Sequence, residues 1–286
     1  MKLIITGAGG FVGKELARFF AANHHVIALT HSALDIANRE AVNRHFKESQ
    51  PDLVINCAVL GVDVCEADPA LAEAVNVAGP KFLAEAVADL DAEIMHLSTN
   101  YVFDGNRELG EFYTIDDEAL PINIYGKTKL AGEQAVLAAA AKSYVVRTSW
   151  VFGAGKVNFF SQAARALAAN QPVQAVNDLW ASVTYVSDLV ARINEILAHR
   201  QYGTYQIVND GCCSHYEFAL ELARRLNPDN AALVEGISDA SAKRLARRPR
   251  NTPMRCLLSE KLGLPPMRSW QSSLPDFFSE LDAQNF

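Results

Sequence analysis

The chain has 286 residues, of which half are hydrophobic in type and 21% are charged, and its formal net charge is −7 at pH 7. This length and composition predict a compact soluble protein that can bury the core of one or two domains. The net negative charge disfavours broad nucleic-acid binding, but it leaves room for a local basic site that binds a phosphorylated small molecule.

Signals for membrane insertion, export and metal binding are missing from the sequence. No uninterrupted apolar run reaches 18 residues, and the start "MKLIITGAGG" passes from apolar residues directly into glycines. The five cysteines lack C-x-x-C spacing and the histidines lack H-x-x-x-H spacing, so we expect neither a disulfide framework nor a metal site. The sequence therefore favours a cytoplasmic protein that neither spans nor binds a membrane.

Short β-branched segments alternate with longer alanine-rich segments in the first half of the chain. The expected strands are residues 2–6, 25–29, 52–56, 93–98 and 143–149, and the expected helices are residues 11–22, 38–49, 69–89 and 125–141. Such alternation is typical of β-α-β units around a parallel sheet. It predicts an α/β protein with a doubly wound parallel sheet, a Rossmann fold for dinucleotides, over residues 1–152.

The alternation weakens beyond residue 152, where prolines, one more expected strand at 203–209 and a basic segment at 243–250 follow. We predict that residues 153–286 form mainly a smaller α/β substrate-binding domain. Part of this region is expected to return and pack on the Rossmann sheet. Because no repeat or flexible linker separates the two parts, they should pack closely.

A glycine-rich segment, "TGAGGFVG", connects the first expected strand to the first expected helix. Gly7, Gly10 and Gly13 follow the spacing G-x-x-G-x-x-G, which lets the backbone approach a diphosphate and lets the helix N-terminus present its free amides to it. A tight strand-to-helix turn is the alternative explanation. The position at the first strand-helix junction favours a nicotinamide cofactor site, to which Phe11 and Val12 also contribute.

The residues after the second expected strand bear on the identity of the cofactor. Asp35 and Ile36 are candidates for contact with the adenine, while Asp35 is equally suited to cap the helix that starts near Asn38. The strand ends in "ALTHS", without the carboxylate that grips a ribose 2′-hydroxyl. The sequence therefore permits NADPH, with NADH as the alternative. His31 and Ser32 are candidates for contact with a 2′-phosphate, although a solvent-exposed loop is the commoner explanation for such residues.

The segment "YGKTK" puts Tyr125 and Lys129 four residues apart, on one face of the expected helix. A lysine ammonium beside a phenol stabilises the tyrosinate, which would lower the phenol pKa from about 10 and make Tyr125 a usable acid. The preceding strand ends at Ser98 and Thr99, which the parallel sheet delivers to its ligand-binding edge. His96 lies inside this apolar strand, where a structural histidine is expected.

Five segments together resemble the extended short-chain dehydrogenase/reductase family, and within it the dTDP-4-dehydrorhamnose reductases. They are "TGAGGFVG", "STNYVFDG", "PINIYGKTKLAGE", "RTSWVFG" and "RPRN", and they extend over most of the chain. The resemblance implies that Thr99, Tyr125 and Lys129 form the catalytic set. In this set the tyrosine protonates the alkoxide that forms as hydride arrives, and the lysine also holds the nicotinamide ribose.

The resemblance also assigns binding residues. It implies that the segment after the third strand lines the cofactor, through Cys57, Ala58 and Val59. It places contacts to the sugar or nucleotide at Asn100, Tyr101, Phe103, Trp150 and Arg248. Trp150 is equally compatible with a place in the core, and Arg248 with a structural role in the "RPRN" turn.

Two segments depart from the family pattern. The family usually has aspartate where this chain has Asn100, and it favours a glycine and a proline in the segment that here reads "NDLWASVTY", residues 177–185. Some members form a magnesium-linked dimer, and Glu15 lies at a matching acidic position. A homodimer is thus compatible with the sequence, but no metal site is assigned.

Three functions are compatible with these observations. The first is NAD(P)H-dependent reduction of the C4 ketone of a nucleotide-linked 4-keto-6-deoxy sugar, dTDP-4-dehydrorhamnose to dTDP-rhamnose. The second is an epimerase or dehydratase on a sugar nucleotide, of which the absence of an acidic pair beside the hydroxyl residues disfavours the dehydratase. The third is a non-catalytic regulatory subunit that binds a cofactor and resembles the β subunit of methionine adenosyltransferase.

Overall fold

The structure of the protein, a computed structural model, describes residues 1–283. Its centre is a six-stranded sheet in which every neighbouring pair is parallel, in the order β10-β5-β4-β3-β1-β2. The strands are β1 (Lys2–Thr6), β2 (His25–Leu29), β3 (Leu53–Asn56), β4 (Glu93–Thr99), β5 (Ser143–Thr148) and β10 (Gly203–Gln206). Their bounds lie within a few residues of the expected ones, because buried β-branched runs identify strands of a parallel sheet well.

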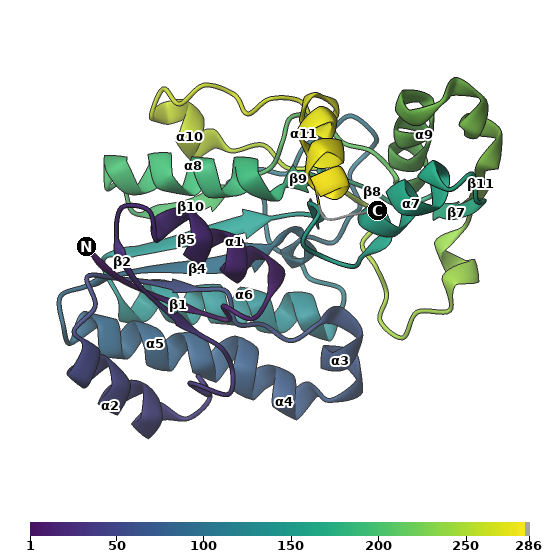
Figure 1. Ribbon diagram of the computed structural model, residues 1–286. Helices are drawn as coiled ribbons and strands as arrows, with labels where there is room; N and C mark the ends of the chain where they lie inside the picture. The colour runs from purple at the N-terminus through teal and green to yellow at the C-terminus, as the bar shows by residue number, and fades with distance from the viewer. Residues whose placement is uncertain (284–286) are drawn as a thin grey trace.

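Helices cover both faces of this sheet (Figure 1). One face packs on α1 (Phe11–Phe20) and α8 (Val186–His199), and the other on α2 (Arg39–Ser49), α5 (Gly79–Ala88) and α6 (Ile124–Ala139). Two separate apolar clusters, one on each face, hold these layers together. The fold is the doubly wound α/β Rossmann fold that the sequence predicts.

The strand order creates a crevice at one point of the sheet. The chain leaves β1 for β2 on one side and then returns past β1 to β3 on the other, so the connections diverge between β1 and β3. Ligands of doubly wound sheets bind at such a switch point, beyond the carboxyl ends of the strands. The loops after β1 and β3 therefore flank the expected cofactor site.

The expected helix near residues 69–89 is present and runs without interruption over residues 69–88, but one π-helical turn breaks its α-helical pattern. The structure has α3 (Val62–Ala67) and α4 (Pro69–Glu73), then a π-helical turn η1 (Ala74–Ala78) before α5. The π turn places the fully buried Asn76 inward, where its amide contacts Leu60, Cys65 and Thr128. These contacts come from distant segments, which explains why helical periodicity gives no sign of the break.

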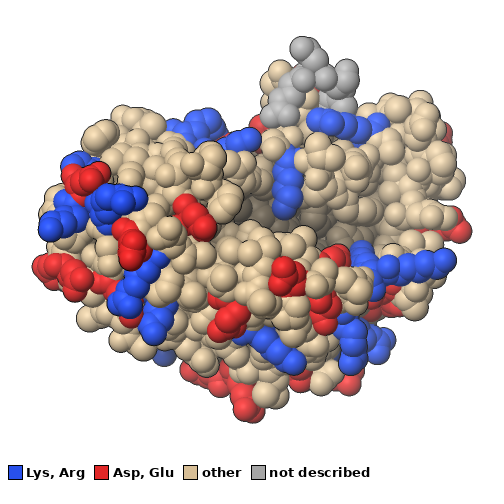
Figure 2. Space-filling view, turned by 90° about the horizontal axis from the view of Figure 1, so that it is seen from below, with Lys and Arg blue, Asp and Glu red and all other residues tan. Residues whose placement is uncertain are grey.

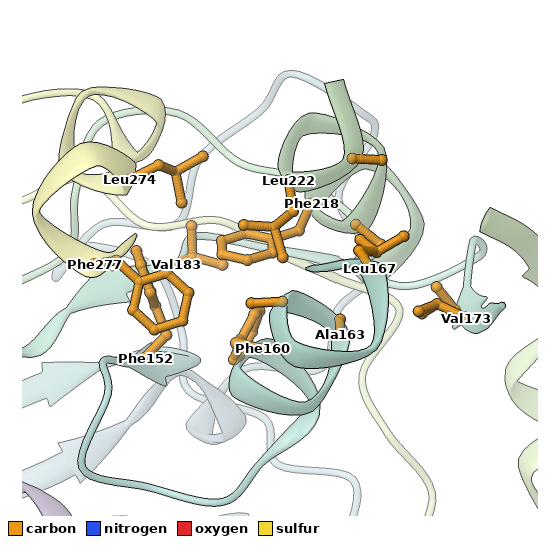
Figure 3. Packing of buried hydrophobic residues seen from close by; sticks show 14 of the residues in the cluster. Phe152, Phe160, Ala163, Leu167, Val173, Val183, Phe218, Leu222, Leu274 and Phe277 are labelled. Atoms are coloured by element: carbon orange, nitrogen blue, oxygen red, sulfur yellow. The ribbon is translucent and has the colours of Figure 1, made fainter. Parts of the chain in front are cut away.

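The second half of the chain contributes to both parts of the molecule. Helix α8 and strand β10 pack on the central sheet, while a separate apolar cluster lies farther along the chain (Figure 3). The ring of Phe152, a strand residue, packs edge to face on the helix residues Phe218 and Phe277, with centroids 5.2 Å and 5.4 Å apart. The division of the chain into domains at residue 152 stays a prediction.

The remaining elements lie partly around this second cluster and partly elsewhere, since α10 packs on the central-sheet cluster and η2 belongs to a small separate one. They include the strand pairs β6 (Val151–Phe152) with β9 (Thr184–Tyr185), β7 (Val173–Val176) with β11 (Val234–Ile237), and β8 (Trp180–Ala181) with β12 (Asn251–Thr252). The helices are α7 (Phe159–Ala168), α9 (His215–Leu226), α10 (Leu257–Lys261) and α11 (Trp270–Ala283), with single 3₁₀ turns η2 (Asn100–Val102), η3 (Pro228–Leu233) and η4 (Asp239–Ala242).

The surface shows how charge is distributed. Figure 2 shows acidic and basic side chains interspersed on the face seen from below, around a hollow whose rim carries Lys and Arg side chains. This face lacks the continuous basic stripe that nucleic-acid binding needs. Within residues 1–283, no helix has the length and apolar character that crossing a membrane requires.

Candidate functional site

The loop after β1 fits a dinucleotide. A cavity of about 410 Å³ opens at the switch point between β1 and β3. Gly7 has a left-handed φ of +67°, and a Cβ there would lie 2.5 Å from the backbone nitrogen of Ala58. Only glycine allows this close approach of the two loops. The cavity lining comprises Gly7, Gly9, Gly10, His31, Leu34, Asp35, Ile36, Cys57, Ala58, Val59, Leu60, Leu71 and Val75.

Helix α1 points its N-terminus at this cavity. Its N-cap is Gly10, and no side chain caps the first turn, so the backbone amides there remain available to an anion. A Cβ at Gly13 would lie 2.5 Å from the carbonyl oxygen of Gly7. Because glycine has no Cβ, the helix can pack this close to the loop after β1. The residues present therefore fit a cofactor diphosphate.

The other cofactor residues predicted from the sequence divide into two groups. Asp35, Ile36, Cys57, Ala58 and Val59 line the cavity together with Gly7 and Gly10. Phe11 and Val12 do not line it; they follow Gly10 in the first turn of α1, where Val12 packs on the core. Their contact with the cofactor stays a prediction.

Asp35 is not the cap of the second helix. Asn38 is the N-cap of α2, and its side chain accepts a hydrogen bond from the amide of Ala41 at 3.0 Å. Asp35 instead accepts from the amide of Ala37 at 3.0 Å and lies exposed beside the cavity. Asp35 therefore lines the cavity without capping α2, and its contact with the adenine stays a prediction.

Tyr125 and Thr99 approach each other from two elements. Tyr125 lies in the first turn of α6, which Asn123 caps by accepting from the amide of Gly126 at 2.8 Å. A Cβ at Gly126 would lie 2.1 Å from the carbonyl oxygen of Tyr101, so glycine lets this turn sit against the segment after β4. Burial raises the pKa of Tyr125 to about 12, and a hydrogen bond with Thr99 at the end of β4 opposes that rise.

The expectation that the charge of Lys129 lowers the phenol pKa is wrong for the cofactor-free protein. The Lys129 Nζ lies 3.0 Å from His96 Nε2 and donates to the carbonyl oxygen of Leu97 at 2.7 Å. The pKa of Tyr125 is raised rather than lowered, because burial dominates and no lysine contributes to the shift. Spacing alone correctly puts Tyr125 and Lys129 on one helix, but it does not reveal where the buried ammonium or amine points.

A buried ion pair supports the helix that carries these residues. Glu133 of α6 accepts from Arg147 of β5, with Nη2–Oε2 at 2.7 Å and Nε–Oε1 at 3.0 Å. Ser98 of β4 donates to the same carboxylate. Because only 2% of the Glu133 side chain and 10% of the Arg147 side chain are exposed, this pair fixes α6 against two strands. The sequence analysis did not identify this pair.

Of three further expected substrate residues, Tyr101 contacts the phenol, whereas Trp150 and Asn100 have other partners. The Tyr101 ring meets the Tyr125 ring edge to face, with centroids 5.7 Å apart. Trp150, partly buried and at a left-handed φ of 37°, stacks on His215 with ring centroids 4.0 Å apart. Asn100 is buried, and its amide donates to the Thr252 hydroxyl at 2.7 Å. Substrate contact by these three residues stays a prediction.

Phe103 is buried in the core, and its contact with the substrate stays a prediction. Its side chain is fully buried and stacks on Tyr113 with centroids 4.3 Å apart, beneath the Arg147 guanidinium. It belongs to a small apolar cluster with Val102 and Met254. The ring packs on Tyr113 and Met254 from distant parts of the chain, contacts that sequence spacing could not show.

Arg248 ties two distant segments together. Its guanidinium donates to the Asp63 carboxylate, with Nη2–Oδ2 at 2.7 Å and Nη1–Oδ1 at 3.1 Å, and to the Ala246 carbonyl at 2.9 Å. This pairing also holds the pKa of Asp63 below its usual value. These bonds favour the structural alternative for Arg248, because its donors are already used to hold the basic segment beside α3.

Residues 1–283 contain no cluster of three or more His, Cys, Asp or Glu side chains able to hold a metal ion. Glu15, which matches an acidic position of the magnesium-linked dimers, pairs instead with Arg18 at 2.7 Å.

The fold and the site together define a class of protein. The short-chain dehydrogenase/reductases combine a doubly wound sheet and a glycine-lined crevice with a tyrosine and a lysine that lie one helical turn apart after the fourth strand. This protein is one of them. Residues 1–283 match the profile of the family described as the RmlD substrate binding domain, and the chain belongs to that family.

Individual relatives are similar over nearly the whole chain. The dTDP-4-dehydrorhamnose reductase of Mycolicibacterium smegmatis is 42% identical over 279 residues, which are 96% of this chain and 84% of the relative. A solved dTDP-4-dehydrorhamnose reductase from Clostridium acetobutylicum has a TM-score of 0.91 at 36% identity, covering 99% of this chain and 100% of that one. The Bacillus anthracis enzyme, solved in complex with NADP, has a TM-score of 0.90 at 33% identity over 98% and 99% of the two chains.

Proposed function

We propose that the protein is an NADPH-dependent reductase that converts the C4 ketone of dTDP-4-dehydrorhamnose to the hydroxyl of dTDP-rhamnose. The observation that carries the proposal is the Thr99–Tyr125 pair, which lies beyond the strand ends in a chain whose glycine-lined cavity fits a dinucleotide. The similarity to reductases of this substrate over nearly the full length supports the same assignment.

The cofactor would be held by the loops after β1 and β3, with its diphosphate at the N-terminus of α1. When bound, it supplies the hydride for C4 of the sugar. NADPH is proposed over NADH because the tip of β2 lacks a carboxylate that would repel a 2′-phosphate, and because the Bacillus anthracis relative binds NADP.

Tyr125 is the proposed acid. Because burial raises its pKa to about 12, the phenol stays protonated at neutral pH and can donate a proton to O4 as negative charge develops there. The Thr99 hydroxyl is placed to donate a hydrogen bond to the same oxygen and to orient the ketone. Reduction of the ketone needs one proton at O4, which Tyr125 can supply. A dehydration needs further acid-base groups.

The remaining functions make different predictions. A non-catalytic regulatory subunit would bind the cofactor without turning over any sugar. An epimerase would return its cofactor to the starting oxidation state and show no net consumption of NADPH. Neither alternative is favoured by a particular contact within residues 1–283.

The test is a spectrophotometric assay with NADPH or NADH and a panel of nucleotide-linked 4-keto sugars. We expect loss of nicotinamide absorbance with dTDP-4-dehydrorhamnose, faster with NADPH than with NADH. Absence of turnover with every panel member, in a protein that binds NADPH by calorimetry, would reject the reductase and leave the regulatory role. Size-exclusion chromatography with light scattering would test the proposed homodimer.

A further inference from the structure

Four buried polar side chains form a continuous chain of contacts across the sheet and into α6. The Thr6 hydroxyl of β1 donates to Asn56 Oδ1 at 2.7 Å, and Asn56 Nδ2 lies 3.0 Å from His96 Nδ1. His96 Nε2 in turn lies 3.0 Å from the Lys129 Nζ. All four residues are at most 1% exposed, so solvent does not satisfy these groups.

The orientation of the Asn56 amide is fixed by a backbone donor. The amide N–H of Ala58 points at Asn56 Oδ1 at 3.1 Å, and a backbone N–H can only donate. Turning the amide over would put its NH₂ group against this N–H. Asn56 therefore presents its oxygen to Ala58 and Thr6, and its NH₂ group to His96.

This orientation determines the tautomer of His96. Because Asn56 Nδ2 donates, His96 Nδ1 must accept and carries no proton. Burial, with a smaller contribution from Lys129, holds the pKa of His96 well below its usual value, so the ring is neutral. A neutral imidazole keeps one proton, which must then be on Nε2, the nitrogen that faces Lys129.

The Nε2–H group faces an atom that has to accept. An ammonium has three donors and no acceptor, whereas a neutral amine has one lone pair. The Lys129 Nζ can accept from His96 and still donate to the carbonyl oxygen of Leu97 at 2.7 Å only as the amine. Buried lysines favour this form because burial penalises the charge.

The surroundings of Lys129 agree with this conclusion. Its nearest carboxylate, Glu133, is already paired with Arg147 and Ser98, and the pKa of Lys129 is lowered to about 8, mainly by burial. The thiols of Cys57 and Cys65 also face this lysine, and Tyr125, whose phenol interacts with Cys65, lies four residues before it. Burial raises the pKa of each of these three groups, so they stay neutral in the range where the lysine titrates.

We propose that Lys129 is held as a neutral amine by the fixed tautomer of His96 in the cofactor-free protein at alkaline pH, and that it takes up a proton when the nicotinamide cofactor binds. Asn56 and His96 are positioning residues in this proposal. A protonated Lys129 cannot keep its bond to Nε2–H, so protonation releases the side chain from His96 toward the ribose that the lysine is expected to hold. This coupling rests on the cofactor of the proposed function.

The sign of the pH dependence follows from the proton uptake. Below the pKa of Lys129 in the free protein, the lysine is charged before and after binding, and cofactor affinity is independent of this group. Above it, binding must take up a proton, so affinity should fall by up to about tenfold per pH unit.

The amine itself can be tested without any cofactor. Nitrogen-15 NMR of the free protein at about pH 9 should show His96 protonated on Nε2 and the Lys129 Nζ with the chemical shift of an amine. A His96 ring protonated on Nδ1, or an ammonium at Lys129 at that pH, would overturn the proposal.

The coupling is tested by calorimetry of NADP⁺ binding in buffers of different ionisation enthalpy, above about pH 7.5, where the 2′-phosphate (pKa about 6) is fully ionised. We expect uptake to approach one proton per NADP⁺ near pH 9. His96→Gln, whose side-chain oxygen can accept from an ammonium, should lower this uptake at least twofold, and Lys129→Met should abolish it. Binding without uptake in the wild type, or undiminished uptake in either variant, would refute the coupling. A failure of NADP⁺ to bind would instead reject the cofactor of the proposed function and leave the NMR result to decide the state of the amine.

Discussion

Replacing Glu133 with alanine should strongly destabilise the protein. The carboxylate accepts from Arg147 through two nitrogens, at 2.7 Å and 3.0 Å, and also from Ser98. Glu133→Ala leaves the guanidinium of Arg147 buried without a counter-ion, since only 10% of that side chain is exposed. Breaking a buried pair in this way costs about 3–5 kcal/mol, so the free energy of unfolding should fall by about that amount.

The control is an ion pair of the same geometry on the surface. Glu260 accepts from Arg255 at 2.6 Å and 2.9 Å, but the two side chains are 44% and 62% exposed. Water and salt screen this pair, so Glu260→Ala should change stability little. A second control, the double variant Glu133→Leu with Arg147→Met, should recover much of the loss, because an apolar pair leaves no buried charge.

The free energy of unfolding of each variant is measured by denaturant unfolding of the cofactor-free protein, followed by circular dichroism. A loss in Glu133→Ala no larger than that in Glu260→Ala would refute the reasoning, because the buried pair would then contribute no more than an exposed one. A double variant as unstable as Glu133→Ala would show that the cost comes from lost packing and not from the orphaned charge.

Three further predictions concern single residues. Gly10→Val should fold but lose NADP⁺ binding by calorimetry, because its side chain would enter the diphosphate cavity that Gly10 lines. Phe103→Ala should lower the free energy of unfolding by about 3–5 kcal/mol in denaturant while leaving the KM for the sugar nucleotide nearly unchanged, because the ring is in the core. Asn76→Ala should destabilise the protein by about 1–3 kcal/mol and weaken NADP⁺ binding, because the Leu60 amide beside the cavity loses its acceptor. A Phe103→Ala protein with a strongly raised KM but normal stability would place that residue in the substrate site.

The sequence allowed the central sheet and its helices to be predicted almost completely. Buried apolar runs such as residues 2–6 and 93–99 carry their own signal, since both faces of a parallel strand are covered. The glycine loop could also be predicted, because glycine is required where a Cβ would clash with nearby backbone, as at Gly7 against Ala58. The return of β10 to the sheet was expected in general terms, but its register against β5 depends on packing that the sequence does not display.

The sequence analysis missed those features that are determined by contacts between segments distant in the chain. The π turn at 74–78 follows from bonds between Asn76 and three separate segments. The position of the Lys129 Nζ depends on His96, a residue whose strand pattern predicted only a structural role. The burial of the Phe103 ring depends on Tyr113, against which it packs in the core. In each case local spacing was correct and the direction of the side chain was set by tertiary contacts.

The central claim, that this protein reduces a 4-keto sugar nucleotide with Tyr125 as the acid, is tested most directly by single-turnover hydride transfer. NADPH and dTDP-4-dehydrorhamnose are mixed with wild-type enzyme and with Tyr125→Phe, and nicotinamide absorbance is followed. We predict rapid oxidation in the wild type and a rate lower by about 10²-fold or more in the variant, with NADPH affinity nearly intact, because only the proton donor is lost. An unchanged rate in Tyr125→Phe, or no hydride transfer by the wild type, would contradict the account.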